Sequence, residues 1–216
     1  MPEMKPQLRE RLKSVISMQG WCTYGKAHHL AQLVLEHKPD IVIDIGVYGG
    51  RTTAAFAMAC QALYNGHVHA IDPWSNAAAL EGGTSKEDDE WWAKIDLEQI
   101  RKTYLSNIQQ LGLEDWITTH HMHDVDALSQ FQDNSVGIIQ NDSNHSSLVS
   151  VRTCRDWVPK LKIGGLMVVD DSHWPSLADA IALMHDGLGT RHLSTNDMFD
   201  EDGKPAGQYM VFERVT

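Results

Sequence analysis

The chain has 216 residues, of which 42% are hydrophobic and 22% charged, and this suits a single α/β domain with its own core. Its 29 acidic residues exceed its 18 basic residues, so the formal net charge of -11 argues against nucleic acid as a partner. The three cysteines, Cys22, Cys60 and Cys154, are scattered; neither a disulfide framework nor a zinc knuckle is expected, and a reducing compartment fits best. There is no apolar signal segment and no run long enough to cross a bilayer, so we expect a cytoplasmic protein with no membrane partner.

Two helical patterns open the chain. The first covers residues 5–19, and the second ends at Lys38-Pro39. We expect residues 1–38 to form a helical cap that belongs to the same domain as residues 39–216. Oligomeric state is open, although these helices would offer a natural contact for a homodimer.

A glycine-rich turn follows the first predicted strand, which ends at Asp44. Gly46, Gly49 and Gly50 would let the backbone turn sharply and approach a ligand closely before a helix begins near Thr52. The spacing does not give the GxGxxG of dinucleotide-binding proteins. A strand–helix connection that happens to be rich in glycine is the alternative.

The second predicted strand, residues 67–72, ends at Asp72. A carboxylate there can accept hydrogen bonds from both hydroxyls of a ribose. Together, the glycine turn and this acid favour a cofactor that contains a nucleoside.

The segment 75–90 is rich in small and acidic residues. A loop of this length is usually functional or mobile, so it is either a lid over the substrate or a solvated insertion. A helical segment is expected from Trp91-Trp92 to about Gln110. After a third strand over residues 116–122, Asp124 stands where a loop could reach the base of a cofactor.

Two carboxylate clusters follow the fourth and fifth predicted strands. Asn141-Asp142 comes directly after residues 135–140, and Asp170-Asp171 comes directly after residues 166–169. In a parallel sheet both clusters lie at the carboxyl ends of neighbouring strands, where α/β proteins bind ligands. Three acids in one cleft repel one another unless they are protonated or neutralised by a cation. Alternatively, Asp170-Asp171 caps the next helix.

Further strands are expected at residues 190–195 and 208–214, and at this point the chain resembles a known family. Val-Ile-Asp-Ile-Gly-Val-Tyr-Gly-Gly and Ala-Ile-Asp-Pro-Trp resemble the first two motifs of class I S-adenosylmethionine-dependent methyltransferases. Asn-Asp-Ser-Asn-His-Ser and Asp-Trp-Val-Pro-Lys-Leu-Lys-Ile-Gly-Gly-Leu-Met-Val-Val-Asp-Asp are similar to two segments of a metal-dependent O-methyltransferase group. That group includes the macrocin and mycinamicin sugar O-methyltransferases and the novobiocin-pathway O-methyltransferase. The similarity covers roughly residues 40–175.

The resemblance implies a Rossmann-like α/β fold with a seven-stranded, mostly parallel sheet, a C-terminal antiparallel strand and an N-terminal helical cap. It also implies roles for particular residues: Asp44, Gly46 and Gly50 for the methionine part of S-adenosylmethionine, Asp72 for its ribose, Asp124 for its adenine, Asp142, Asp170 and Asp171 for a divalent cation, and His173 for the base. The chain departs from the group at Asn141 and Ser143, which replace the usual Ile and Gly.

The expected function is methyl transfer from S-adenosylmethionine to a hydroxyl of a small molecule, such as a sugar or a natural-product scaffold. Oxygen ligands from carboxylates suit Mg²⁺ or a similar ion, which lowers the pKa of a bound hydroxyl. His173 or Asp142 would remove the proton, and His145 is a weaker candidate. The alternatives are a metal-independent methyltransferase acting on a phenol or an amine, a nicotinamide oxidoreductase, and a non-catalytic protein that binds S-adenosylmethionine.

Overall fold

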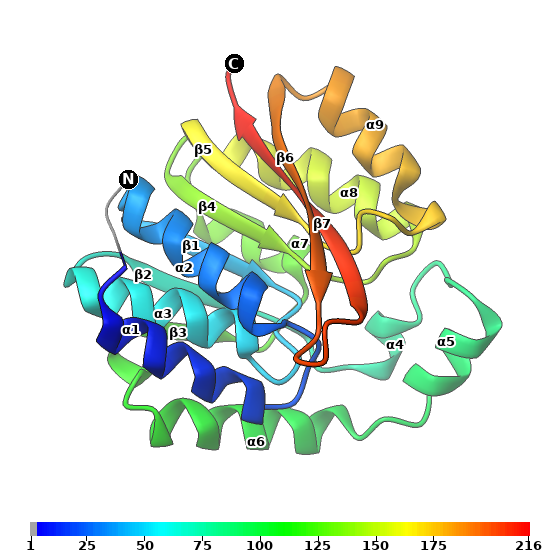
Figure 1. Cartoon of the computed structure of the whole chain (residues 1–216). Coiled ribbons are helices and arrows are strands. Elements are labelled where there is room, and N and C mark those ends of the chain that lie inside the picture. The colour runs from blue at the N-terminus through cyan, green and yellow to red at the C-terminus, as the bar shows by residue number, and fades with distance from the viewer. Residues whose placement is uncertain (1–3) are drawn as a thin grey trace.

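The computed structural model describes residues 4–216, and over these residues seven strands form one mixed sheet of order β3-β2-β1-β4-β5-β7-β6 (Figure 1). The pairs from β3 to β5 are parallel, whereas β7 runs antiparallel to both β5 and β6. The strands are β1 (Ile41–Ile45), β2 (His67–Ile71), β3 (Ile117–His120), β4 (Val136–Asn141), β5 (Leu161–Val169), β6 (Thr190–Phe199) and β7 (Pro205–Arg214). The predicted fold class is confirmed.

Helices cover both faces of this sheet. They are α1 (Pro6–Leu12), α2 (Tyr24–His37), α3 (Arg51–Leu63), α4 (Asn76–Ala79), α5 (Lys86–Trp92), α6 (Leu97–Gln110), α7 (Asp124–Ala127), α8 (Ser147–Trp157) and α9 (Ala178–Asp186). Short 3₁₀ turns are η1 (Lys13–Ser17), η2 (Glu114–Trp116), η3 (Leu128–Gln130), η4 (Val158–Lys160) and η5 (Pro175–Leu177). Among the described residues, no helix has the length and apolarity needed to span a membrane.

The sheet separates two apolar cores because neighbouring strand residues point to opposite faces. On β1, Val42 belongs to the buried cluster that includes residues of α1, α2, α3 and α6, whereas Ile43 belongs to the cluster that includes residues of α8 and α9. Both side chains are fully buried. Residues with such continuous burial on both faces are typical of a parallel sheet between two helical layers.

The N-terminal helix is shorter than the pattern of residues 5–19 predicts. It ends at Leu12, and the turn η1 continues the chain. The hydroxyls of Ser14 and Ser17 donate to the carbonyl oxygens of Arg11 and Ser14, both over 2.7 Å. Serine bonds of this kind compete with the helical ladder and explain the tighter turn.

Two further boundaries differ from the predictions. The segment 75–90 is not a plain loop, because it contains α4 and the start of α5. Strand β5 begins at Leu161, five residues before the predicted start at residue 166, and runs through Gly164-Gly165; its register against β4 shifts between Val136 and Ile138. This irregularity accommodates the two glycines within the strand.

Candidate active site

The site is built on backbone hydrogen bonds that continue one residue beyond the ends of the parallel strands. The amides of Gly46, Asp72, Asp142 and Asp170 donate to the carbonyl oxygens of Ile71, His120, Ile45 and Asn141, over 2.9–3.1 Å. Each acid is therefore fixed at the same edge of the sheet. This is the edge at which parallel α/β sheets bind ligands.

The turn after β1 needs glycine at two positions because other parts of the chain pack closely against it. Gly46 has a φ of 86°, and a Cβ there would lie 2.0 Å from the carbonyl oxygen of Asp142. Gly50 has a φ of 88°, and its Cβ would lie 2.4 Å from the ring of Tyr104. Only glycine fits both positions. The turn thus packs tightly against the loop that carries Asp142.

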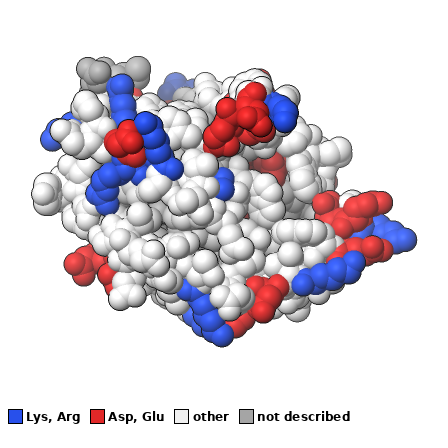
Figure 2. Space-filling view, turned by 60° about the horizontal axis from the view of Figure 1, so that its bottom comes forward, with Lys and Arg blue, Asp and Glu red and all other residues white. Residues whose placement is uncertain are grey.

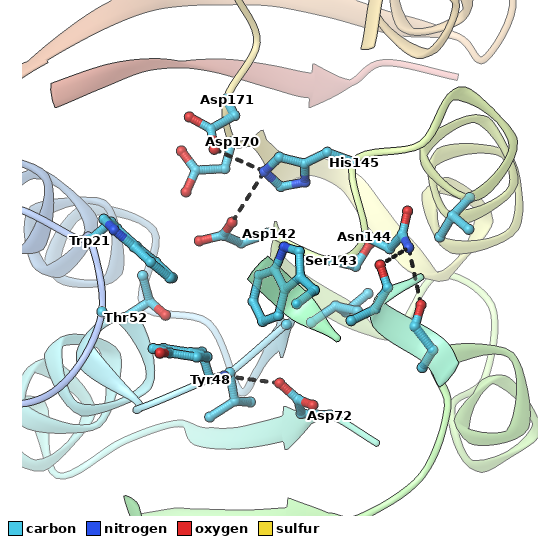
Figure 3. A pocket seen from close by; sticks show the side chains of 18 of the residues that line it. Trp21, Tyr48, Thr52, Asp72, Asp142, Ser143, Asn144, His145, Asp170 and Asp171 are labelled. Carbon is cyan, nitrogen blue, oxygen red and sulfur yellow. Dashed lines mark hydrogen bonds and ion pairs between the residues drawn. The ribbon is translucent and has the colours of Figure 1, made fainter. Parts of the chain in front are cut away.

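A cavity of about 690 Å³ opens over this edge of the sheet. It is lined by predicted site residues from five places in the sequence: Gly46, Asp72, Asp124, Asp142, Asp170, Asp171 and His173. Figure 3 shows Trp21 and Tyr48 on the side of the cavity opposite Asp142, Asp170 and Asp171, with Asp72 beside Tyr48. A volume of this size is in the range of small-molecule sites.

Asp44 and Gly50 do not line this cavity. The Asp44 side chain is fully buried, and its Oδ2 accepts hydrogen bonds from the hydroxyls of Thr52, over 2.8 Å, and Thr53. Burial raises the pKa of Asp44 to about 6, against the effect of the two threonines. Thr52, whose hydroxyl binds Asp44, does line the cavity.

Asp72 is held in place by the glycine turn. Its Oδ2 accepts from the amide of Tyr48 over 2.9 Å, and its Oδ1 accepts from the amide of Trp74 over 2.6 Å. Burial raises the pKa of this carboxyl, and the backbone amides oppose that rise. The carboxylate therefore lies at the cavity wall with a fixed orientation.

Asp124 lines the cavity but is engaged by the protein. Its Oδ2 accepts hydrogen bonds from the Thr153 hydroxyl over 3.1 Å and from the Trp157 indole over 3.3 Å. Its Oδ1 lies 3.9 Å from the guanidinium of Arg152. These bonds fix the start of α7 against α8.

The two neighbouring acids at the end of β5 bind different partners, and Asp142 at the end of β4 lies near both partners. Asp170 forms an ion pair with Lys26 of α2, whose Nζ also lies 3.7 Å from Asp142 Oδ2. Asp171, the next residue, accepts a hydrogen bond from His145 Nε2 over 2.9 Å. The same Nε2 lies 3.8 Å from Asp142 Oδ1 (Figure 3).

This division changes the expected cation site. Asp142, His145 and Asp171 each have one potential ligand atom within 4.8 Å of the others. Within the described part of the chain, these three residues form the group that could hold a metal ion. The group includes His145 and leaves out Asp170. The sequence-based set of three aspartates thus shares two members with the group that the structure brings together.

The charges of Asp142 and Asp170 depend on each other. Burial and then the neighbouring Asp170 raise the pKa of Asp142 well above its ordinary value. Burial acts on Asp170 too, but Lys26 and the adjoining Asp142 carboxyl hold the pKa of Asp170 below its ordinary value. Despite its burial, the two acids raise the pKa of Lys26 and keep it an ammonium ion. A second cation near Asp142 would favour its ionised form.

The predicted base, His173, lies apart from this group. It lines the cavity, is exposed, and makes no hydrogen bond within residues 4–216. His145, by contrast, is bound to Asp171 and packs edge-on against Trp174 at 5.1 Å. The two histidines are therefore in different environments.

The segment 75–90 lies against the loop that carries the acids. Asn144 donates to the carbonyl oxygens of Ala78 and Ala79 over 3.0 and 2.7 Å. Arg152 of α8 pairs with Glu81. Charged side chains gather over α5 at the right of the face in Figure 2, where Glu87, Asp88 and Asp89 form the first turn of the helix.

Aromatic rings form one wall of the cavity. Trp21 is 59% exposed, and its ring lies 4.9 Å from that of Tyr48 and 5.6 Å from that of Trp91. Trp92 contacts both Tyr48 and Trp91. An exposed indole within a cavity indicates a surface that binds an apolar or flat ligand.

Sequence reasoning did not find Lys26, which is 2% exposed. A signal was present, because Lys26 precedes Leu30 by four residues and Val34 by eight, and this spacing puts it on the apolar face of the helix. Buried lysines are rare and need a partner of opposite charge. The pattern alone does not say which acid that partner is.

Residues 43–172 match a protein family described as a methyltransferase domain. This match covers more than half of the chain. The chain belongs to this methyltransferase family.

Several solved structures share the fold of this methyltransferase. The O-methyltransferase from Bacillus cereus, in complex with SAH, has a TM-score of 0.65 and 13% identity, over 99% of this chain and 93% of that one. The O-methyltransferase TomG from Streptomyces achromogenes, involved in tomaymycin synthesis and in complex with SAM, has a TM-score of 0.65 and 12% identity, over 99% and 92%. The SAH-bound methyltransferase PaMTH1 from Podospora anserina has a TM-score of 0.63 and 11% identity, over 99% and 89%. No curated protein matches the sequence.

The predicted methyltransferase family is therefore confirmed. At 11–13% identity, these solved structures support the fold of the methyltransferase.

Proposed function

We propose that this methyltransferase transfers the methyl group of S-adenosylmethionine to a hydroxyl of a small molecule, with a divalent cation at the acid cluster. The observation that carries the proposal is that both groups of residues line one cavity of about 690 Å³. The glycine turn and Asp72 line one part of it, and Asp142, Asp171 and His145 line another. Three structures of the same fold are named as complexes with S-adenosylmethionine or its product.

The residues at one end of the cavity fit a nucleoside cofactor. Asp72 presents a carboxylate whose orientation is fixed by two backbone amides, and such a group can accept the hydroxyls of a ribose. Gly46 and Thr52 would contact the methionine part, with Asp44 behind Thr52. Asp124 would act near the adenine through the backbone of α7, since its carboxylate is bound to α8.

The residues at the other end fit a divalent cation. Asp142 and Asp171 offer oxygen atoms and His145 offers a nitrogen, all within 4.8 Å of one another. A bound divalent ion lowers the pKa of a coordinated hydroxyl and fixes its position.

The chain's own residues then have distinct tasks. Asp142 and Asp171 hold the charge that attracts the ion, and the aromatic wall of Trp21 and Tyr48 holds the acceptor against it. His173 lines the cavity and has a free imidazole, so it accepts the proton of the hydroxyl. Orientation of the oxygen in line with the methyl group supplies much of the rate enhancement. S-adenosylmethionine supplies a methyl sulfonium that needs no further activation.

Calorimetry with S-adenosylhomocysteine tests the cofactor, and product release from a panel of catechols, phenols and sugars tests the reaction. We expect the protein to bind S-adenosylhomocysteine, and Asp142→Asn to keep that binding while turnover falls by at least about 100-fold. Asp115→Asn, at an exposed position outside the cavity, is the matched control. Binding of a nicotinamide cofactor in place of S-adenosylhomocysteine would overturn the proposal. Turnover unaffected by EDTA would leave a metal-independent methyltransferase.

A further inference from the structure

Arg51 holds the segment of chain that carries Trp21. It is the first residue of α3, directly after the glycine turn. Its Nε, Nη1 and Nη2 atoms donate hydrogen bonds over 2.8, 3.0 and 2.7 Å to the carbonyl oxygens of Met18, Cys22 and Ile16. One guanidinium group therefore fixes the backbone on both sides of the Trp21 indole.

The segment 16–22 has few other bonds of its own. Residues 19–22 make no backbone–backbone hydrogen bond with any residue that the structure describes, and the amide of Met18 donates to the carbonyl oxygen of Val15 over 3.1 Å. Met18 and Cys22 are both buried. A buried backbone carbonyl needs a hydrogen-bond donor, and Arg51 supplies one to each of these two residues.

The segment also packs directly on the glycine turn. A Cβ on Gly20 would lie 3.7 Å from Arg51 Cδ and 3.7 Å from Tyr48 Cδ1, so the backbone at Gly20 lies against these two side chains. A Cβ on Gly49 would lie 2.2 Å from the carbonyl oxygen of Gln19. The position of the segment is therefore set by the turn and by the residue that follows it.

Arginine is suited to this task. Its planar group presents five N–H donors in a fixed fork, whereas lysine presents one compact charge. Arg51 lines the cavity, but three of its nitrogen atoms are bound to the backbone of the segment. A side chain that contacts a substrate needs such support to keep its orientation.

We propose that Arg51 is a positioning residue, which holds the segment 16–22 on the glycine turn and so fixes the Trp21 ring in the wall that receives the acceptor. Arg51 acts on the acceptor through Trp21 and does not contact the reacting atoms. The inference rests on the proposed function for the role of the wall, but not for the position of the ring.

The position of the ring can be measured without any turnover. The protein is prepared with ring-fluorinated tryptophan, and the fluorine resonance of Trp21 is assigned by its absence in Trp21→Phe. The ring centres of Tyr48 and Trp91 lie 4.9 and 5.6 Å from that of Trp21, so their ring currents displace this resonance from its position in urea-denatured protein. We expect Arg51→Met to lose the displacement and Arg214→Met to keep it.

Arg214 is the matched control because it makes the same kind of contact elsewhere. It donates hydrogen bonds over 2.8, 2.6 and 2.8 Å to the carbonyl oxygens of Pro159, Leu161 and Thr216. It does not line the cavity. Arg51→Met and Arg214→Met should both lower the Tm, by about 5 °C. A loss of stability alone therefore does not account for an effect that is confined to Arg51→Met.

Kinetics test whether Arg51 acts through Trp21. With the catechol, phenol or sugar that serves as acceptor, we expect the KM for the acceptor to rise about tenfold in Arg51→Met, as in Trp21→Ala, and kcat to stay within about threefold. The double variant should match the single variants, because no indole is left to position; independent effects would multiply to about 100-fold. Arg51→Lys should recover part of the KM, and the affinity of Arg51→Met for S-adenosylhomocysteine should stay within about threefold.

Three outcomes would overturn the inference: an unchanged Trp21 resonance in Arg51→Met, the same loss of displacement in Arg214→Met, or a rise of about 100-fold in the KM of the double variant. A loss of S-adenosylhomocysteine affinity as large as the rise in the acceptor KM would overturn it too, because it would assign Arg51 to the donor. Circular dichroism verifies folding, and Arg51→Lys carries the resonance test if Arg51→Met does not fold. No methyl transfer to any acceptor contradicts the proposed function alone, since the fluorine resonance still decides this inference.

Discussion

Arg152 of α8 donates hydrogen bonds to both carboxylate oxygens of Glu81, over 2.6 and 3.2 Å. This pair links the segment 75–90 to α8, the helix that follows the loop carrying Asp142. The pairing lowers the pKa of Glu81 and keeps its charge. Ala78, Ala79, Glu81 and Trp92 all line the cavity, so the pair also fixes one of its walls.

Loss of this pair should loosen the segment. In Arg152→Met we expect amide hydrogen exchange over residues 76–92 to be about tenfold faster, because charge-assisted hydrogen bonds contribute about 1.5–3 kcal/mol. The KM for the methyl donor should rise by a similar factor. Arg155→Met, on the same helix but exposed and paired with its neighbour Asp156, should leave both unchanged. Equal exchange in the two variants would show that Glu81 does not hold the segment.

Gly46 should tolerate no side chain. Gly46→Ala brings a Cβ to 2.0 Å from the Asp142 carbonyl oxygen at a φ of 86°. Gly112→Ala is the control, because its φ of 64° carries the conformational cost but its Cβ would meet nothing within 4 Å. We expect urea unfolding to show about 1 kcal/mol lost in Gly112→Ala and at least about 3 kcal/mol in Gly46→Ala. Equal losses would mean that the loop of Asp142 moves away freely.

Acid should destabilise the protein through the histidines of β2 and β3. Burial, with His120 and His67 nearby, lowers the pKa of His69 to about 4. In the unfolded chain the pKa of this histidine is about 6.5, so the unfolded state takes up a proton at a higher pH than the folded state does. The low pKa of His69 therefore costs no stability above pH 6.5, and the free energy of unfolding decreases as the pH falls from about 6.5 to about 4.

The measurement is the Tm at pH 7 and pH 5. We expect the fall in Tm between these values to be smaller in His69→Gln than in the unaltered protein, because glutamine has no proton to gain. His37→Gln, at an exposed position at the end of α2, should show the fall of the unaltered protein. Identical falls in all three proteins would contradict the assignment to His69.

The sheet and its acids could be predicted from the sequence because their signals are local. Val42 and Ile43 belong to a short apolar run that ends at Asp44, and glycines follow at once. Since parallel strands bring their carboxyl ends to one edge, Asp72, Asp142 and Asp170 could be assigned to the same site without knowledge of the helices.

Partners far apart in the sequence could not be predicted in the same way. The ion pair of Lys26 and Asp170 joins residues 144 positions apart, and it depends on how α2 packs on the sheet. Asp124 is a similar case, because its contacts with Thr153 and Trp157 are set by the position of α8. Periodicity assigns a side chain to a face of a helix, but tertiary packing decides which group it meets there.

Trp21 should contribute to acceptor binding without contributing to the fold. Its ring is 59% exposed, lines the cavity and contacts Tyr48 and Trp91. An aromatic contact is worth about 0.5–1.5 kcal/mol beyond the area it buries, so in Trp21→Ala we expect the KM for the acceptor to rise about tenfold. The Tm and the affinity for S-adenosylhomocysteine should be unchanged, and Trp21→Phe should recover part of the KM. Tyr64→Ala, which removes a ring that is 88% exposed and outside the cavity, is the control and should have no effect on KM. A rise in the KM for the methyl donor instead of the acceptor would assign the aromatic wall to the cofactor.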